Sequence, residues 1–202
     1  EEAAQDRADA VIRSEIQHHG DAASYVFAGS QVGMMRELFA DKRRAFYGQA
    51  TPVALPPLPP GDVADYVAKR FEASGRAVGA ALDPLLATAQ GHPQRTMLLA
   101  HCLWDATPAG ETATEETWVH AYDQAMRDVQ DELRAIWGGL SVGQRRALVT
   151  VAGNVNGLYA AARAEGGSRG GAVRTATDAL VDAGELVEDP AARSGYRVVD
   201  PL

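Results

Sequence analysis

The chain has 202 residues and a formal net charge of −8, and hydrophobic residues make up 46% of it. This length supports one large domain or two to three small domains with buried cores. No run of about 18 apolar residues exists, so we expect no membrane-spanning helix and no membrane partner. The single cysteine excludes an intramolecular disulfide and favours a reducing, cytoplasmic location.

The acidic charge lies in the first two thirds of the chain. Residues 1–138 carry 12 basic and 20 acidic residues, whereas residues 139–202 carry 7 of each. An acidic surface repels a phosphate backbone, so binding of nucleic acid by the whole chain is disfavoured. The neutral C-terminal segment stays open as a nucleic-acid-binding candidate.

The N-terminal residues alternate between helical and strand patterns. Apolar spacing predicts helices over residues 2–19 and 32–39, and short apolar runs predict strands over residues 24–28 and 51–55. A strand, a crossover helix and a second strand form a parallel βαβ unit. Ligands of parallel sheets bind where strands end, which makes Gly29 and Ser30 candidate ligand-facing residues.

A proline-rich run at residues 56–60 marks the clearest boundary, because no helix interior or central strand contains such a run. Helical patterns follow it, over residues 62–73, 78–89, 94–104 and 114–137. Pro93 suits the first turn of the third of these helices. The sequence therefore predicts a helical bundle over residues 59–138.

The last segment, residues 139–202, has a pattern of its own. Ser141 is a favourable N-cap for a helix. Further periodicity predicts helices over residues 144–152, 158–164 and 171–183, then strands over residues 186–188 and 196–199. Three helices followed by a hairpin are typical of a winged helix-turn-helix. The predicted fold is thus mainly α with a small α/β remnant at the N-terminal end.

The chain lacks the motifs of a complete nucleotide-hydrolysing site. No glycine-rich phosphate-binding loop is present, because neither Lys42 nor Lys69 follows a glycine. No apolar strand ends in paired acids that could hold Mg²⁺, and the five histidines lack metal-ligand spacing. We therefore predict no catalytic residue and no metal ligand in this chain.

The order of these parts nevertheless resembles the second half of a STAND/AAA+-like ATPase of the archaeal-type AAA ATPase family. The resemblance rests on residues 25–30, 34–39 and 56–60, on Gly91-His92-Pro93 and on the winged-helix pattern. It covers almost the whole chain through short motifs. The Walker A and Walker B motifs of the family are absent, and we expect them upstream of residue 1.

The resemblance implies roles for particular residues. Gly29 and Ser30 would form the sensor 1 tip beside the γ-phosphate. Gly91, His92 and Pro93 would form the lid motif near the adenine, with Arg95 as a sensor 2 arginine one residue later than in the tighter form of the motif. The intact protein would bind ATP or ADP with Mg²⁺, and this portion alone would hold neither tightly nor hydrolyse ATP.

Each of these residues has a simpler interpretation. Ser30 would cap the following helix. Gly91-His92-Pro93 would be an ordinary stop and start between helices, and Arg95 would be a solvated helix residue. Both interpretations stay open at this point.

The winged helix also allows two interpretations. Its candidate DNA contacts are Arg169, Arg174, Arg193 and Arg197. In a DNA complex, the helix with Arg169 and Arg174 would lie in the major groove, and the wing with Arg193 and Arg197 would lie on the phosphate backbone. Four arginines in a neutral segment are a small electrostatic footprint, so a protein partner is the other interpretation.

Two other functions remain alternatives. The chain would be a winged-helix transcription regulator with an N-terminal helical sensing or dimerisation domain, or an acidic helical adaptor. The transcription-regulator hypothesis predicts that the chain binds duplex DNA in a salt-dependent way and that Arg174→Ala weakens this binding. The ATPase hypothesis predicts domains over residues 1–58, 59–138 and 139–202, with the P-loop half of the same protein as a partner.

Overall fold

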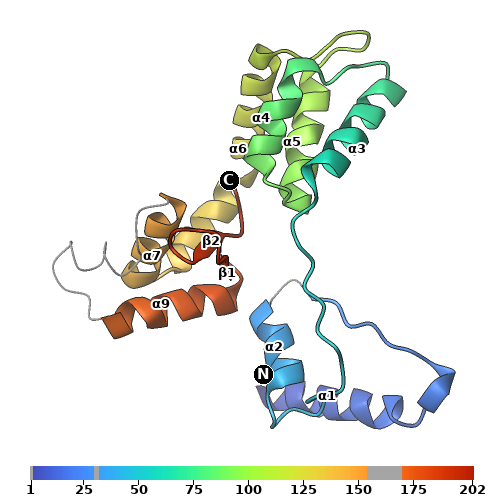
Figure 1. The fold of residues 1–202 in the computed structure, drawn as a ribbon, viewed down its shortest axis with the longest axis vertical. Coiled ribbons are helices and arrows are strands. Elements are labelled where there is room, and N and C mark those ends of the chain that lie inside the picture. Colours follow the sequence, from blue (N-terminus) through green and yellow to red (C-terminus); the bar gives the residue numbers. More distant parts are fainter. Residues whose placement is uncertain (1, 30–31, 154–169) are drawn as a thin grey trace. The chain divides into compact units, whose positions relative to one another are not determined.

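Helices form most of the chain. The computed structural model describes residues 2–29, 32–153 and 170–202. Its α-helices in these ranges are α1 (Glu2–Ile16), α2 (Val32–Ala40), α3 (Pro60–Ala73), α4 (Leu82–Ala89), α5 (Pro93–Ala106), α6 (Glu115–Gly139), α7 (Val142–Ala152) and α9 (Gly170–Ala183). The predicted mainly helical class is confirmed (Figure 1). No helix in the described ranges combines the length and apolarity needed to cross a membrane.

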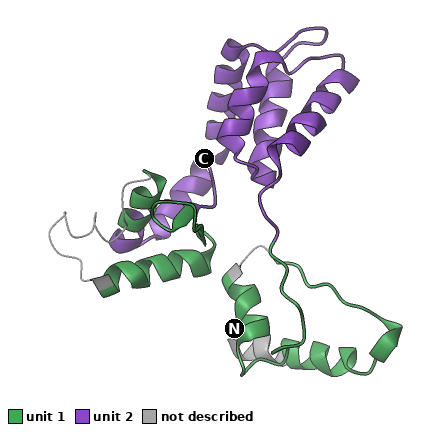
Figure 2. Ribbon diagram, in the orientation of Figure 1, with its two compact units in different colours: residues 1–54, 146–197 green, residues 55–145, 198–202 purple. Residues whose placement is uncertain are grey.

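The chain divides into two compact units (Figure 2). Unit 1 contains residues 1–54 and 146–197, and unit 2 contains residues 55–145 and 198–202. The last five residues thus belong to the same unit as helices α3–α6. The three domains predicted from the sequence stay a prediction.

Unit 2 is built around the buried faces of four helices. Val63, Val67 and Phe71 recur at intervals of four residues on α3, so they lie on one face of the helix, and each is buried. Leu99 and Leu103 have the same spacing on α5 and are fully buried. This spacing predicts the inward face correctly, because helical residues four apart share a side.

Helix α6 begins with a capping box that lacks the usual sequence pattern. The box usually pairs Ser or Thr with Glu or Gln three residues later. Here Thr114 accepts a hydrogen bond from the backbone N–H of Thr117, and the Thr117 hydroxyl accepts one from the backbone N–H of Thr114. A second threonine therefore replaces the acid, and the helix start is closed on both sides.

The end of α6 lies two residues beyond the predicted end. Gly138 and Gly139 continue the helix instead of stopping it. The Arg145 side chain donates hydrogen bonds to the carbonyls of Trp137 and Gly138, at 2.9 and 3.1 Å. These bonds satisfy carbonyls that a helix C-terminus leaves without partners, which explains the longer helix.

The two predicted N-terminal strands are not strands in this structure. Residues 24–28 and 51–55 are neither helix nor strand and make no ladder, and the βαβ pairing is absent from the described residues. Instead, Phe27 packs with Phe39 and Phe46, with ring centroids 5.2 to 5.8 Å apart. A strand needs a partner for its backbone groups, and the described chain supplies none here.

A hairpin of two short strands follows α9 in the C-terminal segment. Strands β1 (Leu186–Glu188) and β2 (Tyr196–Val198) form the one sheet among the described residues. The predicted ranges of these strands are confirmed to within one residue, as are those of α7 and α9 to within two. The middle helix of the predicted winged helix, residues 158–164, lies outside the described residues.

Candidate functional site

The predicted lid motif lies in the turn between α4 and α5. Gln90 and Gly91 both adopt positive φ, at 49° and 73°. His92 is the N-cap of α5, and its ring Nδ1 accepts a hydrogen bond from the backbone N–H of Arg95 at 3.3 Å. Pro93 occupies the first turn of α5, as predicted. The motif therefore lies where α4 ends and α5 begins, and each of its residues contributes to the geometry of this turn.

The turn is held against the proline-rich segment. The backbone N–H of Leu58 donates a hydrogen bond to the Gly91 carbonyl at 2.9 Å. A Cβ on Gly91 would lie only 2.4 Å from the Leu58 carbonyl oxygen. Glycine is thus required at this position both by the positive φ and by the close backbone approach.

An apolar hollow borders the same turn. It has a volume of about 420 Å³ and lies between the proline-rich segment and α4, with Gly91 on its wall. Its walls are formed by Pro57, Leu58, Pro59, Pro60, Val63, Leu86, Ala87, Ala89, Gln90 and Gly91. Apolar side chains and the backbone of the turn form most of this lining.

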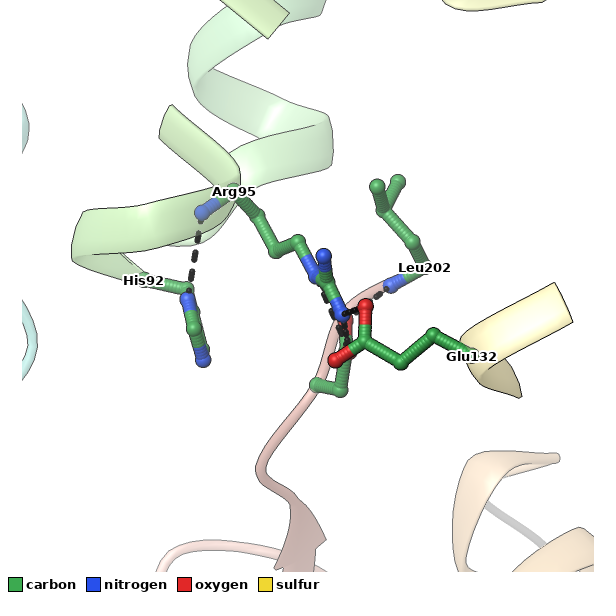
Figure 3. A network of polar contacts seen from close by, with 5 residues as sticks. His92, Arg95, Glu132 and Leu202 are labelled. Carbon is green, nitrogen blue, oxygen red and sulfur yellow. Dashed lines mark hydrogen bonds and ion pairs between the residues drawn. The ribbon is translucent and has the colours of Figure 1, made fainter. Parts of the chain in front are cut away.

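Arg95 is buried, so it is not a solvated helix residue. Its side chain is 3% exposed although it lies in the first turn of α5. The guanidinium donates to both carboxylate oxygens of Asp200, from Nε at 3.1 and 2.9 Å and from Nη2 at 2.6 Å. Nη2 also donates to Glu132 Oε2 at 3.2 Å (Figure 3). Two acids, one from α6 and one from the chain end, therefore neutralise it.

These contacts shift the ionisation of both main partners. The hydrogen bonds with Asp200 raise the pKa of Arg95, and they outweigh the opposing effect of burial. Burial raises the pKa of Asp200, but the hydrogen bonds from Arg95 and from the backbone N–H of Leu202, together with the Arg95 charge, lower it below 3.8 overall. Both groups therefore carry full charge at neutral pH.

Sequence reasoning missed both acidic partners of Arg95. Glu132 lies on the face of α6 that the sequence pattern predicts to be solvent-exposed, and its side chain is half-exposed. Asp200 lies in a short apolar tail, Val198-Val199-Asp200-Pro201-Leu202. The isolated acid between apolar residues is the one local signal that could have pointed to a buried ion pair.

The predicted sensor 1 residues belong to unit 1. Gly29 lies in the extended segment after residue 28, where a Cβ would come within 2.7 Å of the Met35 side chain. Ser30 lies outside the described residues. The structure brings Gly91, His92, Pro93 and Arg95 together in unit 2, and it describes Gly29 separately in unit 1.

The described candidate DNA contacts have acidic neighbours. Arg174 on α9 pairs with Asp178 at 3.8 Å, and Arg197 on β2 pairs with Asp189 at 3.8 Å. Arg193 is exposed in the hairpin turn. Arg169 lies outside the described residues. Paired arginines offer less net charge to a phosphate backbone than isolated ones.

The described part of the chain holds few groups suited to other chemistry. Cys102 is buried on α5, as a small hydrophobe would be, and burial raises the pKa of its thiol. Across residues 2–29, 32–153 and 170–202, no three His, Cys, Asp or Glu side chains lie close enough to hold a metal ion.

Comparisons with models of protein families, with curated proteins and with solved structures find no match to this chain. Function must therefore be inferred from the residues and their geometry.

Proposed function

We propose that this chain is the C-terminal portion of a STAND/AAA+-like ATPase, in which it acts as a nucleotide-dependent regulatory switch. Residues 1–58 would complete the nucleotide-binding α/β domain, residues 59–138 would form the helical lid and residues 139–202 the winged helix. The chain alone would not hydrolyse ATP, because it has no P-loop.

The observation that carries this proposal is the burial of Arg95, two residues after Pro93 of the Gly91-His92-Pro93 turn. A buried ion pair adds little net stability compared with apolar residues of similar volume, because both charges lose their hydration. Stability alone therefore gives little reason for an arginine here. A guanidinium at the start of a lid helix suits recognition of a phosphate, whose oxygens match its planar fork.

The exposed N-terminal segments also support the proposal. Val26, Val53 and Leu55 are 94%, 78% and 89% exposed in segments that are neither helix nor strand. Apolar side chains of this kind are typical of strands in a sheet covered on both faces. In the proposal, the P-loop half of the same protein supplies the neighbouring strands, and the parallel βαβ unit forms with them.

The proposed switch works through the separation of its parts. Ser30 would contact the γ-phosphate or the attacking water, and Pro93 would lie near the adenine. Arg95, on the lid, would neutralise phosphate charge only when the lid closes. Closure would then depend on whether ATP or ADP with Mg²⁺ is bound, and the winged helix would report that state to a protein or DNA partner.

The coding sequence upstream of Glu1 tests this proposal directly. We expect it to encode Walker A and Walker B motifs, and we expect the chain extended by that sequence to bind ATP with Mg²⁺. An upstream sequence without a P-loop contradicts the proposal. So does ATP hydrolysis by the purified 202-residue chain that Ser30→Ala abolishes.

Duplex DNA binding separates the switch from the alternative regulator. The switch predicts little affinity of this chain for DNA. Salt-dependent binding in the micromolar range or tighter, weakened by Arg174→Ala, would favour the winged-helix transcription regulator instead. Arg127→Ala, on α6, is the matched control because it removes the same charge from another unit.

A further inference from the structure

The last five residues form a strap over unit 2. They begin at Val198, the last residue of β2, yet they belong to the helical unit. Asp200 accepts the three hydrogen bonds from Arg95, and Leu202 packs against the hydrophobic core of that unit. The backbone N–H of Leu202 donates to Asp200 Oδ1 at 3.0 Å, which fixes the carboxylate within the strap.

Asp200 occupies the atoms that Arg95 would offer to an anion. The Nε and Nη2 groups form the edge of the guanidinium that binds a carboxylate or a phosphate in bidentate fashion. Both of these groups donate to Asp200, and Nη2 is shared with Glu132. With the side chain only 3% exposed, no second anion reaches the same edge until the carboxylate leaves.

We propose that Asp200 is an internal competitor for the anion that Arg95 binds, so that docking of the strap and binding of a polyphosphate at Arg95 exclude each other. The identity of that anion as a nucleotide phosphate rests on the proposed function. Because residues 198–202 continue β2, release of the strap reaches the hairpin through the backbone. Engagement of phosphate would thereby free the C-terminal end of the hairpin.

Removal of the Asp200 charge tests this competition in the 202-residue chain. Inorganic tripolyphosphate is titrated into the native chain and into Asp200→Asn by calorimetry. If the strap is docked in nine molecules of ten or more, its loss should tighten the apparent affinity about tenfold or more, because only the undocked state binds. Arg95→Gln added to Asp200→Asn should abolish the gain.

A control variant removes the same charge elsewhere on unit 2. Asp131 is exposed on α6 and pairs with Arg134 at 3.6 Å, so Asp131→Asn should bind tripolyphosphate like the native chain. Equal affinities of the native chain and Asp200→Asn overturn the proposal. A gain that survives without Arg95, or that Asp131→Asn reproduces, overturns it equally.

A second variant and a second readout guard against misfolding. The chain truncated after Val199 removes residues 200–202 of the strap without placing an amide beside Arg95, and it should show the same gain in affinity. In the native chain, saturating tripolyphosphate should shift the NMR signal of the Arg95 side-chain Nε–H and speed hydrogen exchange in residues 198–202. An unchanged strap under saturating anion overturns the competition.

The outcomes also separate this inference from the proposed function. A tenfold gain in Asp200→Asn, together with an upstream sequence that lacks a P-loop, supports the strap and contradicts the nucleotide switch. Equal affinities, together with a P-loop upstream, overturn the strap and leave the nucleotide switch standing.

Discussion

Arg95 and Asp200 are 105 residues apart in the sequence, and their side chains form a bidentate ion pair with Nη2 of the guanidinium 2.6 Å from Oδ2 of the carboxylate. This pair joins the first turn of α5 to the end of the chain. Both the proposed switch and the proposed strap depend on it, so its contribution to the fold must be separated from its contribution to binding.

The first prediction concerns the stability of unit 2. Arg95→Gln leaves Asp200, 20% exposed, without its cationic partner. We expect the free energy of unfolding to fall by about 3 kcal/mol, because removal of one member of a buried pair leaves an uncompensated charge. The three tryptophans, Trp104, Trp118 and Trp137, all lie in unit 2, so their fluorescence in urea reports this unit.

The control for that measurement is Arg127→Gln. The Arg127 guanidinium is exposed and donates to the Gln124 side chain on the same helix. Loss of such a contact should change the free energy of unfolding by about 0.5 kcal/mol or less. Equal changes in the free energy of unfolding would show that the buried pair contributes no more to stability than the exposed contact of Arg127.

The second prediction concerns the pH dependence of the same pair. The pKa of Asp200 is lower in the folded chain than in the unfolded chain, where we take it as about 3.9. The ionised carboxylate therefore contributes stability above pH of about 4, and this contribution is lost as pH falls through the folded pKa.

The native chain and Asp200→Asn should accordingly converge in acid. The difference between their free energies of unfolding should be constant from about pH 5 to pH 7 and should shrink below about pH 4. Urea titrations at each pH, followed by tryptophan fluorescence, measure it. A difference that stays constant down to pH 2 contradicts the lowered pKa.

Local signals explain what the sequence predicted well. The α5 helix begins at Pro93 because proline, the His92 cap and the positive φ of Gly91 all act within four residues. The capping box of α6 was missed for an equally local reason, since Thr117 serves where Glu is usual. The signals at the start of α5 are residue types with known positions at a helix end, so the sequence displays them directly, whereas a threonine at the third position of a capping box is not the usual signal.

Non-local partners explain what the sequence did not predict. The Asp200 carboxylate that buries Arg95 is 105 residues away, and no periodicity connects the two positions. The predicted strands at residues 24–28 and 51–55 form no ladder here for a related reason: a short apolar run indicates that a segment suits a sheet, but the partner strands decide whether a ladder forms. Here the Phe27, Phe39 and Phe46 cluster replaces it.

The third prediction concerns the basic run at residues 42–44. The Arg43 side chain donates hydrogen bonds to the Asp41 carboxylate, and with the Arg43 backbone N–H it lowers the pKa of Asp41 to about 2. Arg43→Gln should raise this pKa toward 3.8. Carbon-13 NMR titration of the carboxyl measures the change, and Lys42→Gln should leave the pKa of Asp41 at about 2.

Titration of Asp41 also bears on function. Arg44 lies 3.5 Å from Asp9 and 3.4 Å from Glu37, so acids neutralise this arginine as well. The run therefore offers little net charge to a phosphate. An Asp41 pKa near 3.8 in the native chain would contradict the pairing.

The last prediction concerns Gly91 in the predicted lid motif. Gly91→Ala places a Cβ 2.4 Å from the Leu58 carbonyl oxygen in a backbone with φ of 73°. Gly110→Ala is the matched control, because Gly110 has φ of 85° and no atom within 4 Å of the added Cβ. We expect Gly110→Ala to cost about 1 kcal/mol, the usual penalty for a left-handed L-residue.

Gly91→Ala should cost clearly more, about 2–4 kcal/mol, because the backbone of residue 58 must also move. Urea unfolding followed by tryptophan fluorescence compares the two variants. The hydrogen bond from the Leu58 N–H to the Gly91 carbonyl should weaken, which faster hydrogen exchange at Leu58 would report. Equal costs for the two substitutions would mean that the turn tolerates displacement from the proline-rich segment. In that case the hollow beside Gly91 would have no fixed wall, and the predicted lid motif could not use that wall to position a ligand.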